Sequence, residues 1–102
     1  MDITISITPS HVEYLRRKVF KILYLFEENN DGLSKYIHSL MYEIHGLKNL
    51  LEESKIPQFD SVLSILYHMY EDSYKTNVDM QNIRSEVFHC SDLIKKSFQA
   101  AS

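Results

Sequence analysis

Apolar residues recur at alternating steps of four and three over residues 33–51, and this repeat constrains the fold more than any other feature of the sequence. It consists of Leu33, Ile37, Leu40, Ile44, Leu47 and Leu51. Side chains three and four positions apart share one stripe of an α-helix, and such a stripe packs against other helices at a shallow angle. The repeat predicts a helix over about residues 33–54. We expect it to end before Pro57, because the residue preceding a proline is driven out of the helical region.

Three other segments show similar apolar spacing and predict helices over about residues 9–28, 57–75 and 78–98. Ser10 and Glu13 have the spacing of a capping box at the start of the first helix, and Asp31 is expected to cap the second. The chain of 102 residues contains only two glycines and two prolines, too few for a turn-rich β-protein. These features predict one all-α domain over residues 1–102, folded as a four-helix, up-and-down antiparallel bundle.

The first eight residues have a different pattern. Ile3, Ile5 and Ile7 alternate with hydroxyl residues, which is the periodicity of a β-strand. A single strand has no partner within a helical bundle. We therefore expect residues 1–8 to form a short extended arm that packs over the bundle or joins two copies as a homodimer.

Composition narrows the classes of partner. The formal net charge is −3 and no basic run exceeds residues 16–18, which argues against nucleic acid as a partner. No stretch approaches the roughly 18 apolar residues of a membrane span, and the N-terminal residues do not resemble a signal peptide. The single cysteine, Cys90, lies on the apolar stripe of the last predicted helix and fits a reducing compartment. We expect a cytoplasmic protein with no membrane partner.

The segment YEIHGLKNLLEE, residues 42–53, carries the candidate chemistry. On a continuous helix, His45 lies on the exposed flank, with Lys48 and Asn49 beside it at i+3 and i+4. An exposed imidazole near an ammonium group suits a phosphoryl acceptor. The neutral ring nitrogen is nucleophilic, and the lysine can offset phosphoryl charge. The candidate partner-binding residues of this region are His38, Met41, Asn49 and Glu52.

The segment IHGLKNLL, residues 44–51, resembles the histidine phosphotransfer domains of bacterial phosphorelays and chemotaxis kinases. Their motif reads His–Ser/Thr–Leu/Ile–Lys–Gly, and His45, Leu47 and Lys48 match it. The segment SVLSILYHMYE, residues 61–71, is similar to the third helix of the chemotaxis type, with His68 and Glu71 at its His-x-x-Glu positions. The resemblance implies that His45 accepts and donates a phosphoryl group, that Lys48 stabilises charge, and that Glu71 with His68 orients the ring. The implied partner is a receiver domain or kinase.

A second interpretation assigns no chemical role to His45. A small acidic helical protein can act as a non-catalytic regulator, inhibitor or immunity-type factor that docks on a target protein. The seven tyrosines fit either boundary packing or a binding face. Whether the chain is an enzyme stays open. No cofactor is expected, because a phosphoryl donor can bring its own metal or ATP site. No metal site is expected either, because His38 and His45 stand one heptad apart, too far to share one ion without another helix.

Overall fold

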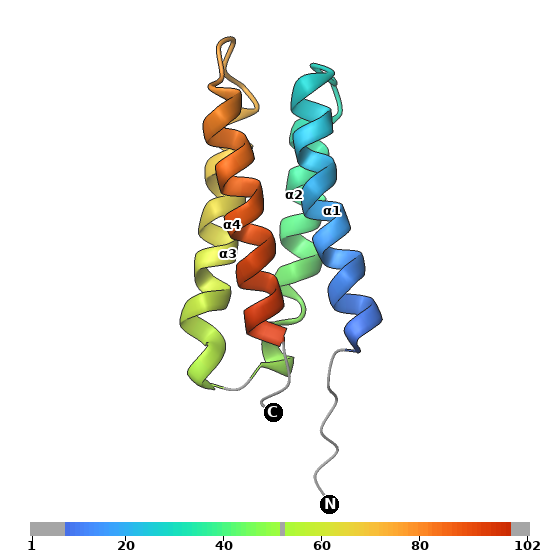
Figure 1. Cartoon of the computed structure of the whole chain (residues 1–102), viewed down its shortest axis with the longest axis vertical. Coiled ribbons are helices and arrows are strands. Elements are labelled where there is room, and N and C mark those ends of the chain that lie inside the picture. The colour runs from blue at the N-terminus through green and yellow to red at the C-terminus, as the bar shows by residue number, and fades with distance from the viewer. Residues whose placement is uncertain (1–7, 52, 99–102) are drawn as a thin grey trace, which may run out of the picture.

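The computed structural model describes residues 8–51 and 53–98, and these contain four α-helices (Figure 1). They are α1 (Pro9–Glu27), α2 (Leu33–His45), α3 (Ile56–Asp72) and α4 (Met80–Phe98). Two short 3₁₀ helices, η1 (Lys48–Leu50) and η2 (Glu53–Lys55), join α2 to α3. Successive helices run in opposite directions, and α1 also packs antiparallel to α4 (Figure 1). The predicted all-α antiparallel four-helix fold is confirmed.

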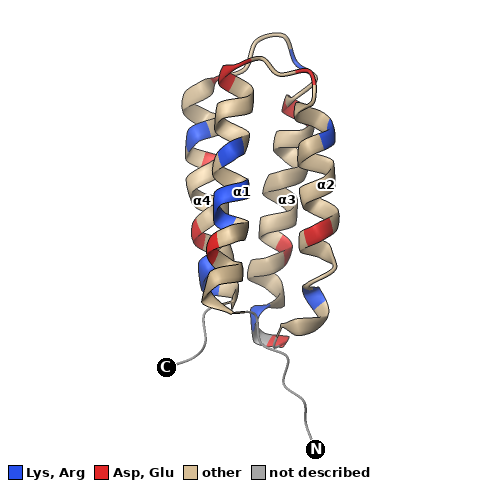
Figure 2. Cartoon of the chain, turned by 90° about the vertical axis from the view of Figure 1, so that its right-hand side faces the viewer, with Lys and Arg blue, Asp and Glu red and all other residues tan. Residues whose placement is uncertain are grey.

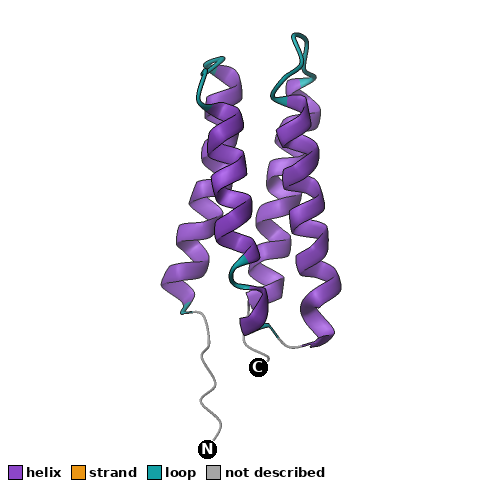
Figure 3. Ribbon diagram, turned by 180° about the vertical axis from the view of Figure 1, so that it is seen from behind, coloured by secondary structure: helices purple, strands orange, loops and turns teal. Residues whose placement is uncertain are grey.

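No strand occurs among the described residues, which are helices joined by short loops (Figure 3). The predicted extended arm falls almost wholly on residues 1–7, outside that part of the chain. In the part of the chain that the structure describes, no helix has both the length and the hydropathy of a membrane-spanning segment.

The apolar stripes of the four helices face one another and form one core. Its buried apolar residues are Leu15, Val19, Ile22, Leu25, Phe26, Leu33, Ile37, Leu40, Ile44, Phe59, Val62, Leu66, Met69, Ile83, Val87, Cys90 and Ile94. Some residues that continue the predicted stripes toward helix ends or connections are only partly buried. They are Val12, Leu47, Leu51, Met80 and Phe98. The three- and four-residue spacing therefore identified the core-facing side of every helix.

Hydrogen bonds at both ends of α1 explain its limits. The Thr8 side-chain oxygen accepts a hydrogen bond from the His11 N–H at 3.2 Å, so Thr8 caps the helix and the Ser10 capping box was wrong. At the other end, Asn29 adopts a left-handed φ of 56°. The N–H groups of Asn29 and Asn30 donate to the Phe26 and Leu25 carbonyls, a Schellman motif. Asparagine tolerates this backbone better than most residues do, which stops α1 before the turn.

The largest difference from the sequence prediction concerns α2, which ends at His45 rather than near residue 54. Glycine costs about 1 kcal/mol relative to alanine inside a helix, and Gly46 is the first residue after α2. Beyond it the hydrogen bonds tighten to the i to i−3 pattern, with the Leu47 N–H donating to the Ile44 carbonyl at 2.9 Å. Leu51 is then extended, with φ −93° and ψ 147°, so the chain can turn back into α3.

Two smaller boundary differences occur. Helix α3 ends at Asp72 rather than Lys75, and α4 begins at Met80 rather than Val78. The α3–α4 loop is therefore longer than predicted, because it includes the last residues of one predicted helix and the first residues of the next. Asp31 does not cap α2, whose cap residue is Gly32 without a side-chain hydrogen bond.

The three basic residues at positions 16–18 of α1 all form ion pairs. The Arg16 and Arg17 side chains contact Glu13 on the same helix at 3.5 and 3.9 Å. The Lys18 Nζ atom lies 3.1 Å from Glu43 Oε1, which joins α1 to α2. Basic and acidic residues are accordingly interspersed on the face of the bundle seen in Figure 2.

Candidate functional site

His45 is the last residue of α2, and its side chain is exposed as the helix phase predicted. It makes no hydrogen bond, ion pair or ring contact with any residue in the described part of the chain. Because α2 stops there, the helical arrangement that places Lys48 and Asn49 beside His45 is absent. The continuous α-helix predicted to carry all three residues is wrong, whereas the exposure of His45 is confirmed.

Lys48 lies in η1 and is engaged elsewhere. Its Nζ atom is 3.1 Å from Oδ1 of Asp60 on α3, so its ammonium group joins the α2–α3 connection to α3. Asn49 is exposed in the same 3₁₀ helix, and Met41 is half-buried against the core. Glu52, the remaining residue predicted to contact a partner on this side, lies outside the described residues.

The structure does not bring His68 and Glu71 to His45. The ring of His38 contacts that of Tyr70 with centroids 5.8 Å apart, which sets the level of α3 against α2. His45 follows His38 by two helical turns, or about 10 Å along the axis. The His68 ring instead contacts α4 on another side of α3, and Glu71 is exposed near the far end of that helix. The predicted support of His45 by these residues is therefore not present.

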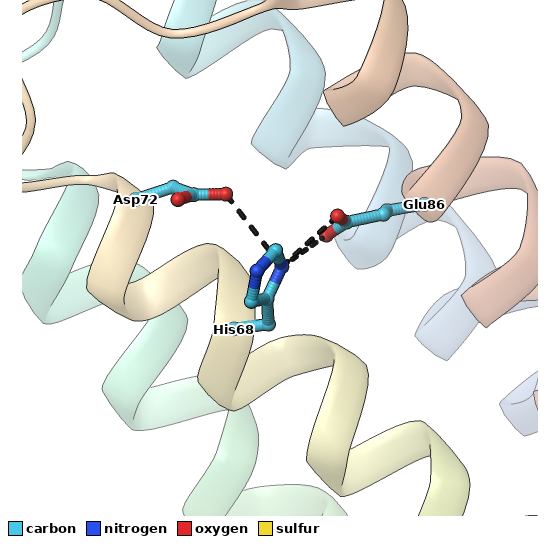
Figure 4. Close-up of side chains that lie close together, drawn as sticks. All are labelled: His68, Asp72 and Glu86. Carbon is cyan, nitrogen blue, oxygen red and sulfur yellow. Dashed lines mark hydrogen bonds and ion pairs between the residues drawn. The ribbon is translucent and has the colours of Figure 1, made fainter.

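His68 belongs to a different cluster, the acid–histidine cluster of His68, Asp72 and Glu86 (Figure 4). Its Nδ1 atom lies 2.9 Å from Glu86 Oε1 and 3.6 Å from Asp72 Oδ2. Asp72 is one turn after His68 on α3, and Glu86 comes from α4. Asp72 is 5% exposed, so its carboxylate is the most deeply buried charged group of the three.

Neighbouring side chains hold both carboxylates in place. Lys75 Nζ lies 2.8 Å from Asp72 Oδ1, and the Asn82 amide donates to Glu86 Oε1 at 2.9 Å. The hydrogen bond with Glu86 raises the pKa of His68 above 6.5, and the charges of Glu86 and Asp72 raise it further, while partial burial and the charge of Lys75 oppose them. The cluster therefore favours a cation at the His68 position, either a protonated ring or a positive ion.

This pKa shift predicts how stability depends on pH. Because the pKa of His68 is raised in the folded state, the protonated ring stabilises the folded protein. This stabilisation is complete below about pH 6.5 and is lost as the pH rises through the folded-state pKa. We expect the loss of unfolding free energy caused by His68→Gln to be larger at about pH 5.5 than at about pH 8.5. Urea denaturation in the presence of a chelator measures it.

His45→Gln is the control, because His45 makes none of these contacts. It should leave the pH profile of wild type unchanged. An equal effect of His68→Gln at both pH values would contradict the assigned contact.

A second feature is the aromatic face, defined by His38 and Tyr42 on α2 and Tyr67, Tyr70 and Tyr74 on α3. His38 contacts Tyr42 at 4.9 Å and Tyr70 at 5.8 Å between ring centroids. Tyr70 also contacts Tyr67 at 6.3 Å and Tyr74 at 5.4 Å. The exposed fractions of Tyr42, Tyr67 and Tyr74 are 70%, 53% and 68%. The five rings thus form one connected surface across two helices.

Hydroxyl groups also link this face. The Tyr70 and Tyr74 oxygens are 3.0 Å apart, and the hydrogen bond between them raises the pKa of Tyr70 and lowers that of Tyr74. The remaining strongly exposed aromatic residues, Tyr14, Tyr24 and Phe88, are distributed over α1 and α4.

Sequence reasoning missed both arrangements. The His68 and Asp72 spacing of four residues was visible, but Glu86 joins them only because α4 packs on α3. Tyr67, Tyr70 and Tyr74 stand at helical spacing, which could have identified one aromatic stripe. Their contact with His38 depended on how α2 lies against α3.

Comparison with known proteins provides no further assignment. A scan against protein-family models found no matching family, and searches of curated proteins and of solved structures found no match. The likeness of residues 44–51 to histidine phosphotransfer domains therefore stays a prediction.

Proposed function

We propose that this protein is a non-catalytic binding module that docks on a partner protein through its aromatic face. The observation that carries the proposal is the connected set of five rings on α2 and α3, three of them more than half exposed. Tyrosine is enriched among the residues that dominate binding energy, because its ring buries apolar area while its hydroxyl group forms hydrogen bonds.

Contacts within the face favour binding further. Each ring touches at least one other, so the side chains are already restricted before a partner arrives. Restriction in the free state lowers the conformational entropy lost on association. The helices beneath the rings pack on the core through Ile37, Leu40, Leu66 and Met69. The surface is therefore presented on a rigid support.

The charge of the surface indicates the partner's chemistry. Glu71 is exposed and stands four residues after Tyr67 and three before Tyr74, which places its carboxylate beside these rings on α3. Ring faces attract arginine and lysine, and the whole chain has a formal charge of −3. We propose a protein target that presents arginine or lysine among apolar side chains, with the chain acting as a cytoplasmic regulator or inhibitor.

Site-specific crosslinking tests this surface directly, because the target need not be identified beforehand. A photoreactive phenylalanine analogue is placed at Tyr42 or at Tyr67, and the protein is irradiated in cells of the source organism. Both positions should form an adduct of the same mass. Tyr24 on α1, 61% exposed, is the matched control and should not form it. Adducts that form equally at Tyr24, or no adduct at either test position, would contradict the proposal.

The captured partner then allows an affinity measurement. Truncation of a central interface tyrosine costs about 2 kcal/mol or more, equivalent to about 30-fold in Kd. Tyr67→Ala is expected to weaken binding by this factor, whereas Tyr24→Ala should change it less than threefold. Circular dichroism of both variants should show an unchanged fold, because both side chains are exposed.

One observation favours a second candidate function. His45 is exposed and free of contacts with other described residues, so a partner can reach its ring. In a phosphorelay, a ring nitrogen would attack the aspartyl phosphate of a receiver domain. The P–O bond breaks as the P–N bond forms, the aspartate leaves as a carboxylate, and the other ring nitrogen releases its proton. Lys48 would have to leave Asp60 to assist.

Labelling distinguishes this second candidate. The protein is mixed with a panel of phosphorylated receiver domains, and phosphate that is labile in acid and stable in alkali is measured. Label on wild type and on His38→Gln, but not on His45→Gln, would support phosphotransfer. No label on wild type, or equal label on His45→Gln, would exclude His45 as a phosphoryl carrier.

A further inference from the structure

The acid–histidine cluster combines three potential metal ligands from two helices. His68 and Asp72 lie one turn apart on α3, and Glu86 points toward them from α4 (Figure 4). One ligand atom from each residue can be chosen so that all three lie within 4.8 Å of one another. An imidazole with two carboxylates is a donor set that divalent transition metals accept, and the nitrogen disfavours Mg²⁺ and Ca²⁺.

The separations between these atoms fit a small ion. Zinc lies about 2.0–2.2 Å from nitrogen and oxygen ligands, so ligands at the corners of a tetrahedron are about 3.4 Å apart. The distances from His68 Nδ1 to Glu86 Oε1 and Asp72 Oδ2 are 2.9 and 3.6 Å. Two of the three ligand separations are thus close to those of a zinc site. In the set of three atoms that lie within 4.8 Å of one another, no separation exceeds the tetrahedral value by more than about 1.4 Å, which rotation of the glutamate side chain can close.

Neighbouring side chains orient the ligand atoms. Lys75 contacts Asp72 through Oδ1, which leaves Oδ2 directed at His68. Asn82 donates to Glu86 Oε1 and orients its carboxylate, as residues behind metal ligands commonly do. The His68 side chain is 54% exposed, so an ion can enter from solvent and a water molecule can complete its coordination.

We propose that His68, Asp72 and Glu86 bind one divalent transition-metal ion, with Zn²⁺ as the best fit, and that the ion fastens α3 to α4. Metal would bind through Nδ1 of His68, the atom that otherwise interacts with the carboxylates. Binding therefore displaces any proton from Nδ1 and weakens as the pH falls. The site lies near the α3–α4 loop, where a crosslink limits separation of the two helices.

Titration of the full chain with Zn²⁺ tests this directly. Isothermal calorimetry of chelator-treated protein should show one ion per chain, and Mg²⁺ should not compete. His68→Gln and Glu86→Gln each remove a ligand while preserving the size of the side chain. Each should weaken binding by more than the roughly 10–100-fold that loss of an orienting residue alone causes. His45→Gln, which removes an exposed histidine outside the cluster, should bind as wild type does.

Co²⁺ provides a spectroscopic test, because its visible absorption bands depend on which side chains bind the ion. Loss of a residue that only stabilises the fold would leave these bands unchanged. Wild type and His45→Gln should show visible absorption bands from bound Co²⁺, and His68→Gln should lose them. The proposal is overturned if wild type does not bind Zn²⁺ at millimolar concentration, or if the cluster variants bind as tightly as wild type. Equal binding of Mg²⁺ would also overturn it. Should one cluster variant fail to fold, the other decides the result.

Discussion

Replacing Phe59 with alanine is expected to destabilise the folded protein by about 3–5 kcal/mol, because it leaves a cavity in the core near one end of the bundle. Phe59 is 0% exposed and is one of the largest fully buried side chains. Its ring meets that of Phe98 edge to face with centroids 5.9 Å apart, which joins the start of α3 to the end of α4. Domains of this size are stable by about 5–15 kcal/mol, so the change would remove a large part of the total.

Urea denaturation followed by circular dichroism measures this loss. Phe88→Ala is the matched control, because Phe88 is 55% exposed and its ring contacts only the edge of the core through the half-buried Phe20. It should cost less than about 1 kcal/mol. If Phe59→Ala does not fold, Phe59→Leu should still do so with a loss of about 1.5 kcal/mol. A similar loss of unfolding free energy for Phe59→Ala and Phe88→Ala would contradict the burial of Phe59 in the core.

The thiol of Cys90 is expected to react at least about 1,000-fold more slowly in the folded protein than in the unfolded chain. Burial, with a smaller contribution from the charge of Glu86, raises the pKa of Cys90 from 9.0 to about 12. Only the thiolate is nucleophilic, and three pKa units lower its population at neutral pH by about 1,000-fold. Exclusion of the reagent from the core slows the reaction further.

A disulfide reagent added at neutral pH measures this rate by absorbance. Cys90 is the sole cysteine, so the signal comes from one site. Protein unfolded in urea is the reference and should react at the ordinary rate. Folded protein should react only through opening of the bundle, so Phe59→Ala should speed the reaction. A folded-state rate within tenfold of the unfolded rate would contradict the burial of Cys90.

The two proposed surfaces lie on different sides of α3. Tyr67, Tyr70 and Tyr74 project toward α2 and solvent, whereas His68 and Asp72 approach α4. The partner-docking and metal-binding proposals can therefore fail independently. Tyr67→Ala should not alter Zn²⁺ binding, and His68→Gln should not alter crosslinking at Tyr42.

The arrangement of the candidate site around His45 could not be predicted from the sequence, because it depended on where α2 ends. The phase of α2 correctly placed His45 on the exposed side, since that inference needs only the apolar stripe. The positions of Lys48 and Asn49 required the helix to continue. Gly46 weakens helical propensity there, and the chain must also reverse direction within ten residues to reach α3. The apolar residues Leu47 and Leu51 continue the stripe, so periodicity alone overlooked the break.

The sequence by itself determined which residues face the core and that the chain forms an antiparallel helical bundle. These properties follow from local spacing, because burial of an apolar stripe stabilises each helix against its neighbours. Only the tertiary structure decided that Glu86 meets His68, that Lys48 pairs with Asp60 and that His38 joins the tyrosines of α3. Such contacts depend on the rotation and level of one helix against another. Packing of the whole core sets both, and no single segment encodes them.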